Sequence, residues 1–334
     1  MPAPLERVRG IYIEVLLLSI TVKRDQLIDS VRDVLAKTGF FLSEPHGERG
    51  LCFDFVARRD NLLLIVKVLQ NVDALNKATA EELKNIARSL RGSPVVIGDR
   101  TGTGGLEDGV IYSRFGVPIL SRKTFLDFFQ EGVPPFIYSA PGGLYVKLDT
   151  DSLRRIREQG QLSLGTLAEI AGVSRRTIQM YLEGMSASID VAARLEQFLH
   201  EPLVLPVDPF AFLSSEEAVP PAAAQLEAFE RELFQRLERL GYNVLPTVRS
   251  PFDGLARHEE RTYLAGVESA DTKLEQKATI VSNIGRVVEK DAVMFVERRT
   301  IRLSIQGLPV IAREELRKVK NRDAVEDLIA ERKG

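Results

Sequence analysis

The stretch Ser163–Met185, SLGTLAEIAGVSRRTIQMYLEGM, decides the fold of the central part of this 334-residue chain. It predicts two short helices, the first capped by Ser163 and the second capped by Ser174 and ended by Gly184. Gly172 can adopt the left-handed backbone that a tight turn between two steeply crossing helices requires. Apolar residues at helical spacing would form the shared core: Leu167, Ile170, Val173, Ile178 and Leu182.

Further helices are predicted on both sides of this pair, so residues 149–199 are expected to be all helical. Leu153–Arg157 begins a helix before the pair, and Ser188 can cap a closing helix after it. One apolar face of that closing helix would contain Val191, Ala192, Leu195 and Phe198. Beyond its own core, this segment shows no additional apolar face.

The string at Ser163–Met185 resembles the helix-turn-helix of the Cro/CI (XRE-like) family. It differs from the commonest family pattern at Leu164, where a phosphate-contacting glutamine is usual, and at Leu182, often a glutamate. The wider chain, including PGGLYVKLD at 141–149 and FDFVARRD at 53–60, resembles the archaeal HTH-type transcriptional regulators of this family over nearly its whole length.

This resemblance implies that the helix at about 174–183 lies in the major groove with its first residues at the base edges. Arginine is the usual reader of guanine, and glutamine of adenine, while Arg155 and Arg157 could contact phosphates beside Arg154. The candidate DNA-binding residues are Arg175, Arg176, Gln179, Met180, Ser174, Thr177, Ser163 and Arg154. The alternative is a helical interaction module with solvated arginines.

Mixed α/β segments flank the helices. We expect an α/β domain at 1–132, the helix-turn-helix domain at 133–200, a Pro-rich linker at 201–225 and a second α/β domain at 226–334. In the first domain we predict helices at 26–37, 81–90 and about 124–129, and strands at 51–57, 62–69, 93–97 and 117–120.

The two α/β segments resemble one another. Phe53–Arg58 matches Phe252–Arg257, and Pro94–Ile97 matches Ala292–Phe295, with nearly equal spacing between the matches. Gly116-Val117-Pro118-Ile119 and Gly307-Leu308-Pro309-Val310 follow in the same order. We interpret the pattern as a duplication; the alternative is two unrelated domains that share common strand and turn residues.

Both segments have the layout of restriction-endonuclease-like folds, in which two carboxylates hold a divalent metal and a lysine helps to activate water. Asp54 and Lys67 fit this layout, but Ile65 occupies the position of the second carboxylate. Asp253 is followed by Gly266-Val267-Glu268, which again lacks the required triplet. We therefore predict nuclease-like scaffolds without catalytic or metal-binding residues, and interpret both aspartates as turn-capping residues at strand ends.

Three other patterns receive a structural interpretation. The glycine-rich loop Gly98–Gly105 lacks the lysine of a P-loop, so we expect a flexible connector rather than a phosphate site. The basic run 317–322 is expected to be a solvated helix face, or else a phosphate contact. Histidines 46, 200 and 258 lie in different segments, which gives no local triad or metal site.

Composition excludes several classes of protein. With 45 basic and 47 acidic residues, DNA binding would have to come from a local arrangement. The richest apolar run, residues 11–20, is too short for a membrane span and is interrupted by Glu14, and the N-terminus MPAPLERVRG lacks a secretory layout. The single Cys52 excludes an intrachain disulfide. We expect a soluble, cytoplasmic protein without a cofactor.

These observations predict a sequence-specific, DNA-binding transcriptional regulator that is not an enzyme. Double-stranded DNA is the expected partner, together with an unknown effector or protein. We expect a homodimer whose subunits meet through the flanking α/β domains, which contain apolar strands such as 62–69 and 293–296, or else a monomer with internal pseudo-symmetry. The alternatives are a metal-dependent nuclease and a protein-interaction adaptor without salt-dependent DNA affinity.

Overall fold

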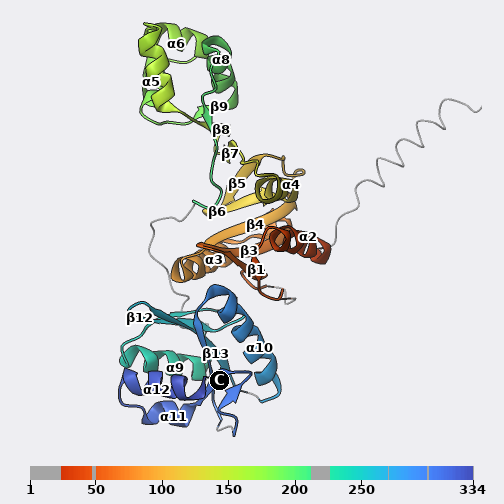
Figure 1. The fold of residues 1–334 in the computed structure, drawn as a ribbon, viewed down its shortest axis with the longest axis vertical. Helices are drawn as coiled ribbons and strands as arrows, with labels where there is room; N and C mark the ends of the chain where they lie inside the picture. The colour runs from red at the N-terminus through yellow and green to blue at the C-terminus, as the bar shows by residue number, and fades with distance from the viewer. Residues whose placement is uncertain (1–23, 47–49, 212–225, 270, 299–300, 334) are drawn as a thin grey trace, which may run out of the picture.

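The computed structural model describes residues 24–46, 50–211, 226–269, 271–298 and 301–333. Two α/β domains lie next to each other, and a helical unit extends from the first of them at the top of Figure 1. The apolar run at 11–20 and the N-terminal sequence considered above lie outside the described residues. Within the described ranges, no helix combines the length and the apolar character that crossing a membrane requires.

The first α/β domain is built on strands in the order β1-β2-β3-β4-β6-β5. Helix α2 (Arg24–Lys37) packs on one face and α3 (Lys77–Leu90) on the other, because alternate strand residues such as Val66 and Ile65 face opposite sides. The remaining elements are β1 (Phe41–Leu42), β2 (Phe55–Arg59), β3 (Leu62–Asn71), a short turn of helix (Val72–Ala74), β4 (Ser93–Arg100), β5 (Val110–Arg114), β6 (Val117–Ser121), α4 (Arg122–Leu126) and a wide helical turn (Asp127–Glu131).

Strand β2 lies later in the chain than the predicted 51–57. A two-residue turn, in which Asp60 has φ +51°, brings Arg58 and Arg59 into the ladder with β3. The residues before Phe55 instead form part of the contact between the two α/β domains, as described below.

The second α/β domain repeats the first, which confirms the duplication. Its strand order, β11-β12-β13-β14-β16-β15, has the same sequence of parallel and antiparallel pairs. Helix α10 (Asp271–Val288) covers one face, and α9 (Ala228–Arg239), α11 (Arg313–Lys318) and α12 (Arg322–Arg332) cover the other. The strands are β11 (Asn243–Pro246), β12 (Gly254–His258), β13 (Arg261–Glu268), β14 (Asp291–Val296), β15 (Ser304–Ile305) and β16 (Leu308–Ala312).

The two α/β domains share one hydrophobic core. The faces covered by α3 and by α10 belong to a single cluster, in which the rings of Phe53 and Phe252 lie 6.3 Å apart. Polar contacts cross the same boundary: the carboxylate of Glu82 accepts hydrogen bonds from the backbone of Val248 and Arg249, at 2.9 and 2.6 Å. The duplicated domains therefore form an internal pair within one chain.

The two strands named as examples of the expected subunit contact, 62–69 and 293–296, are not available for it. Strand β3 lies between β2 and β4, and β14 lies between β13 and β16. Residues of both strands are buried on the two faces of their sheets, so these strands have no free edge or face for a second subunit.

The helical unit is joined to the first sheet by strands. β7 (Ile137–Ala140) pairs in parallel with β5, and the hairpin partner β8 (Gly143–Leu148) pairs with β9 (Ala187–Ser188) and β10 (Val204–Leu205). Four helices complete the unit: α5 (Thr150–Gln159), α6 (Leu164–Ala171), α7 (Arg175–Leu182) and α8 (Ile189–Leu199).

The start of the predicted Pro-rich linker is ordered against the first domain. Val207 and Phe210 are buried in the core beside α2, and the Ser93 hydroxyl donates a hydrogen bond to the carbonyl of Phe210. The Val207 N–H also donates a hydrogen bond to the Pro135 carbonyl at 2.8 Å. The segments that enter and leave the helical unit are therefore held together. Residues 212–225 of the linker lie outside the described residues.

Candidate nucleic-acid interface

Helices α6 and α7 form a helix-turn-helix, as the sequence predicts. The Ser163 hydroxyl accepts a hydrogen bond from the Thr166 N–H, and Ser174 accepts one from Thr177, at 3.0 and 3.1 Å. Gly172 ends α6 in the left-handed conformation, at φ +68°, which lets the chain turn sharply into α7. The serine before each helix therefore fixes the residue at which α6 and α7 begin.

Neighbouring helices hold the pair in place. The predicted core residues Leu167, Ile178 and Leu182 are buried with residues of α5, α8 and β8, whereas Ile170 and Val173 are partly exposed. From α8, the guanidinium of Arg194 donates a hydrogen bond to the Ala171 carbonyl at 2.7 Å, where α6 ends. This contact satisfies a carbonyl that a helix C-terminus otherwise leaves unpaired.

Four of the candidate reading residues lie on one exposed surface. The side chains of Arg175, Arg176, Gln179 and Met180 all project from the solvent-facing side of α7. The guanidinium of Arg175 crosses the start of α6, 3.2 Å from the place that a Cβ atom of Gly165 would take. The Gln179 amide donates to the Glu183 carboxylate at 3.2 Å, which orients it along the helix.

The other candidates have structural partners as well. Ser163, Ser174 and Thr177 belong to the two helix caps described above. Arg154 bonds the Leu182 carbonyl at the far end of α7 and the Asp151 carboxylate at 3.1 Å, so it ties α5 to α7. Arg155 is exposed on α5, whereas Arg157 donates to the Leu162 carbonyl at 3.3 Å.

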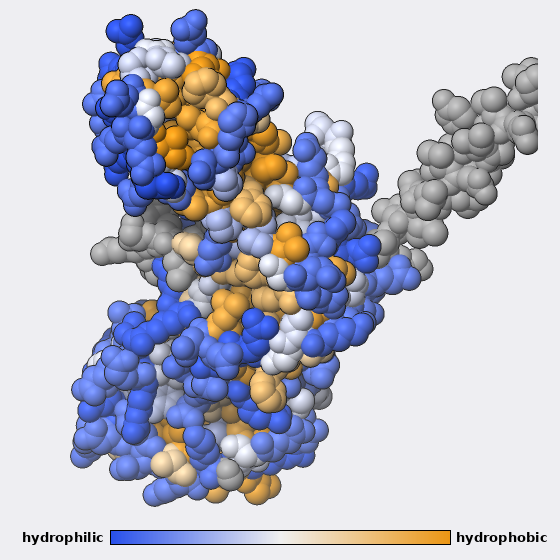
Figure 2. Space-filling view, turned by 45° about the horizontal axis from the view of Figure 1, so that its top comes forward, coloured by the Kyte–Doolittle hydropathy of each residue, from blue (hydrophilic) through white to orange (hydrophobic). Residues whose placement is uncertain are grey.

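Hydrophobic surface is present on the helical unit, contrary to the expectation from sequence. Figure 2 shows an apolar area on the upper unit, bordered by hydrophilic residues. Large apolar side chains that are exposed between residues 133 and 205 are Val133, Phe136, Met180, Phe198 and Leu205. Phe198 was expected on the buried face of α8. It is 45% exposed, whereas Val191, Ala192 and Leu195 of the same helix are buried.

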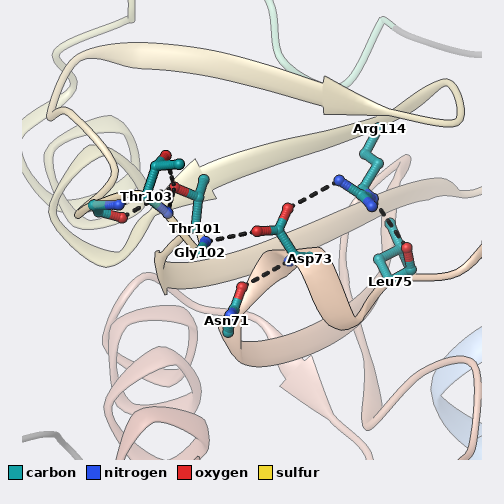
Figure 3. A network of polar contacts seen from close by, with 8 residues as sticks. Asn71, Asp73, Leu75, Thr101, Gly102, Thr103 and Arg114 are labelled. Atoms are coloured by element: carbon teal, nitrogen blue, oxygen red, sulfur yellow. Dashed lines mark hydrogen bonds and ion pairs between the residues drawn. The ribbon is translucent and has the colours of Figure 1, made fainter.

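The glycine-rich loop of the first domain, expected to be a flexible connector, is held by several hydrogen bonds in the structure. Figure 3 shows its contacts: the Gly102 N–H donates to the Asp73 carboxylate at 2.6 Å, and Arg114 donates to the other oxygen at 2.9 Å. The N–H groups of Thr103 and Gly104 donate to the Thr101 hydroxyl, each at 3.2 Å. The loop therefore uses internally the N–H groups that a phosphate-binding loop presents to its ligand.

The carboxylate of Asp54 is fully buried and does not cap a turn. It accepts hydrogen bonds from the Val68 N–H at 2.6 Å and from Lys67 at 3.2 Å, and it forms an ion pair with Arg24. Our turn-capping interpretation is therefore wrong. The buried carboxylate is used to join β2, β3 and α2.

The second domain has a related but different arrangement. Asp253 accepts from the Val267 N–H at 2.5 Å, but its lysine partner, Lys277, comes from helix α10 and lies 2.7 Å away. Burial raises the pKa of Asp253 to about 6, against the lowering effect of Lys277. Among the described residues, no three His, Cys, Asp or Glu side chains are grouped so that they could hold a metal ion.

The basic run 317–322 and the histidines do not form a common site. The basic run 317–322 is not one helix face, because α11 ends at Lys318 and α12 begins at Arg322. Arg317 pairs with Glu232 at 2.7 Å and Arg322 bonds His258. His46 lies in the first α/β domain, while His200 ends α8.

Comparisons with known proteins agree with this organisation. Residues 24–135 match a family model described as a PD-(D/E)XK superfamily domain, and residues 153–205 match one described as a helix-turn-helix. The chain is similar to proteins named "Putative HTH-type transcriptional regulatory protein" from three archaea. Identity is 38% to the Methanococcoides burtonii protein (92% of this chain, 97% of that one), 38% to the Halorubrum lacusprofundi protein (93% and 98%) and 34% to the Archaeoglobus fulgidus protein (88% and 94%). No solved structure gives a significant match.

Proposed function

The chain belongs to this archaeal family of HTH-type transcriptional regulatory proteins, and we propose that it binds specific DNA sequences by placing α7 in the major groove. The observation that carries the proposal is the surface formed by Arg175, Arg176, Gln179 and Met180 at the capped start of that helix. Ser163, Ser174 and Thr177, on the same caps, would contact the phosphate backbone, and Arg154 would do so from α5.

Each group has a chemistry suited to this role. A guanidinium can donate two parallel hydrogen bonds to guanine, and a primary amide can pair with adenine. The N-terminal ends of α6 and α7 carry partial positive charge, which favours nearby phosphates. A local surface of this kind can bind DNA although the whole chain has a net charge of −2.

In this proposal the two α/β domains (1–132 and 226–334) do not catalyse a reaction. The DNA-reading domain (133–200) and the linker (201–225) lie between them in the sequence. Both buried aspartates are already bonded to a lysine and to a strand N–H. The domains instead support the reading unit and bind partners. The protein would act in the cytoplasm, where DNA is accessible.

We also propose that the regulator acts as a homodimer on an inverted repeat. A two-fold pair would present two copies of α7 about 34 Å apart, one turn of DNA. Because the α/β domains already cover one another, the contact would use exposed apolar residues of the reading unit such as Phe198.

Selection of bound sequences from random duplex DNA by the full chain tests the proposal. We expect enrichment of one short motif, in two inverted copies, with affinity that falls as salt rises. Recovery of unenriched sequences, or binding that does not depend on salt, would contradict it and favour the protein-interaction adaptor.

A further inference from the structure

Helix α6 contains a glycine, Gly165, that its backbone does not require. The residue is the second of the helix, and its φ lies outside the left-handed region that favours glycine. Glycine is the poorest helix former apart from proline, so an alanine at this position would by itself strengthen α6. What distinguishes the position is the side chain that lies beside its Cα atom.

That side chain is Arg175, which extends from the start of α7 across the start of α6. The three heavy atoms closest to the place that a Cβ atom of Gly165 would take all belong to its guanidinium group: Nε and Nη2 at 3.2 Å and Cζ at 3.4 Å. A methyl group at position 165 would be closer to these atoms than van der Waals contacts normally are. The guanidinium would therefore have to shift.

No opposite charge holds Arg175 in this place. It makes no hydrogen bond or ion pair with another described residue, unlike Arg154, which bonds the Leu182 carbonyl. The start of α6 itself carries partial positive charge, which does not attract a guanidinium. Arg175 can lie there because Gly165 has no side chain, and its five N–H donors remain available for DNA.

The contact confines a long side chain without using its hydrogen-bonding groups. An exposed arginine loses rotamer freedom when binding orders it, and a group that is already confined loses less. Arg176, the next residue, is also exposed, but its atoms are not among those nearest to any described glycine. Arg176 is therefore an internal comparison for Arg175.

We propose that Gly165 is a positioning residue for DNA recognition, because it leaves the space in which the Arg175 guanidinium is confined before it meets the bases. This inference rests on the proposed DNA-binding function. Gly165 would contact no base itself. It would act through Arg175, and it would set how strongly that arginine discriminates at its base pair.

The confinement of Arg175 can be measured without DNA. Nuclear magnetic resonance relaxation of the arginine Nε–H groups in the full chain reports how freely each guanidinium moves, and Arg175→Ala identifies the signal of Arg175 by removing it. We expect Arg175 to be more restricted than Arg176 in the unchanged protein, and as mobile as Arg176 in Gly165→Ala. Equal mobility of the two arginines in the unchanged protein would overturn the proposal.

A double-mutant cycle on a selected duplex tests the consequence for binding. Gly165→Ala should weaken binding about 5-fold and reduce discrimination at the same base pair as Arg175→Ala does, whereas preferences that depend on Arg176 should not change. In the Arg175→Ala background, the Gly165 substitution should have no further effect. Gly165→Ala should not lower the midpoint of denaturant unfolding, because alanine favours the helix. The unfolding measurement separates a loss of positioning from a loss of folding.

Two binding results would also overturn the proposal. One is a Gly165→Ala protein that binds the selected duplex with unchanged affinity and unchanged discrimination. The other is an equal loss of affinity with and without Arg175, since Gly165 would then act independently of that arginine. Failure of the unchanged protein to select any duplex would refute the DNA-binding function itself, and it is distinguishable from both results because it does not depend on the substitution.

Discussion

The rings of Phe53 and Phe252 lie 6.3 Å apart, and each residue immediately precedes the buried aspartate of its own domain. Both rings are completely buried in the cluster that the two α/β domains share. The duplication has thus produced two domains that use equivalent residues to bury one another, and neither can be removed without exposing the core face of the other.

Phe252→Ala should therefore destabilise both α/β domains. Removing a fully buried phenylalanine typically costs about 3–5 kcal/mol. We expect hydrogen exchange to accelerate in α3 of the first domain as well as in α10 of the second. Phe41→Ala is the matched control, because Phe41 is 78% exposed and its removal should change stability by less than about 0.5 kcal/mol. Unchanged exchange in α3 would show that the domains are stable independently.

The local parts of the fold could be predicted from the sequence because each rests on a short-range rule. Ser163, Ser174 and Gly172 have fixed roles in capping and turning, which a reader can recognise within a few residues. The duplication could be predicted too, since its matching segments keep their order and spacing.

Long-range partners could not be predicted in the same way. Lys277 reaches Asp253 from a helix, whereas Lys67 reaches Asp54 from a strand, and no spacing rule links these two arrangements. The shared core and the unpaired His46 depend on how two folded domains pack, which a single sequence pattern does not specify. For the same reason, the exposure of Phe198 was missed although its helix was predicted.

Arg175→Ala and Arg176→Ala should each weaken specific DNA binding by roughly 1–3 kcal/mol per lost base contact, and alter preference at one or two positions. Arg239→Ala, an exposed arginine on α9 of the second α/β domain, is the control and should bind like the unchanged protein. Titration of a selected duplex at fixed salt gives the affinities of the three variants and of the unchanged protein. Unchanged binding by both α7 variants would mean that another surface reads the DNA.

Acidification below about pH 6.5 should lower the contribution of His46 to stability, because this residue titrates differently in the two states. Asp253, whose pKa is raised to about 6, acts in the opposite direction over the same range. The pKa of His46 is lowered from 6.5 to about 4 by burial and by Arg32, so between these values the unfolded chain binds a proton that the folded chain does not. Linkage gives a loss of about 2 kcal/mol between pH 7 and pH 5.

His46→Gln should remove that part of the pH dependence, since glutamine does not titrate. The comparison needs denaturant unfolding of both proteins at pH 7 and pH 5, with the difference between the two pH values as the readout. An equal loss in both proteins would assign the acid sensitivity to other groups.

The nuclease-like domains should not cleave DNA. Ile65 occupies the place of a second carboxylate, and both Asp54 and Asp253 are occupied by lysine and backbone partners. Incubation of single- and double-stranded DNA with the protein and Mg²⁺ or Mn²⁺ should leave the DNA intact. Cleavage that Asp54→Ala or Asp253→Ala abolishes would establish the alternative, a metal-dependent nuclease.

Two copies of the chain should associate through the reading unit rather than through the α/β domains. Strands β3 and β14 each lie between two other strands of their sheet and are buried on both faces. Phe198 on α8, in contrast, is 45% exposed. Light scattering of the unchanged protein, with and without a selected duplex, should give the mass of a dimer. Phe198→Ser should shift the mass toward that of a monomer, while Phe115→Ser, a 39% exposed residue of the first α/β domain, should not. A monomer under both conditions that selects an asymmetric site would exclude the dimer and leave one reading helix, supported by the internal pair of α/β domains, as the whole DNA-binding unit.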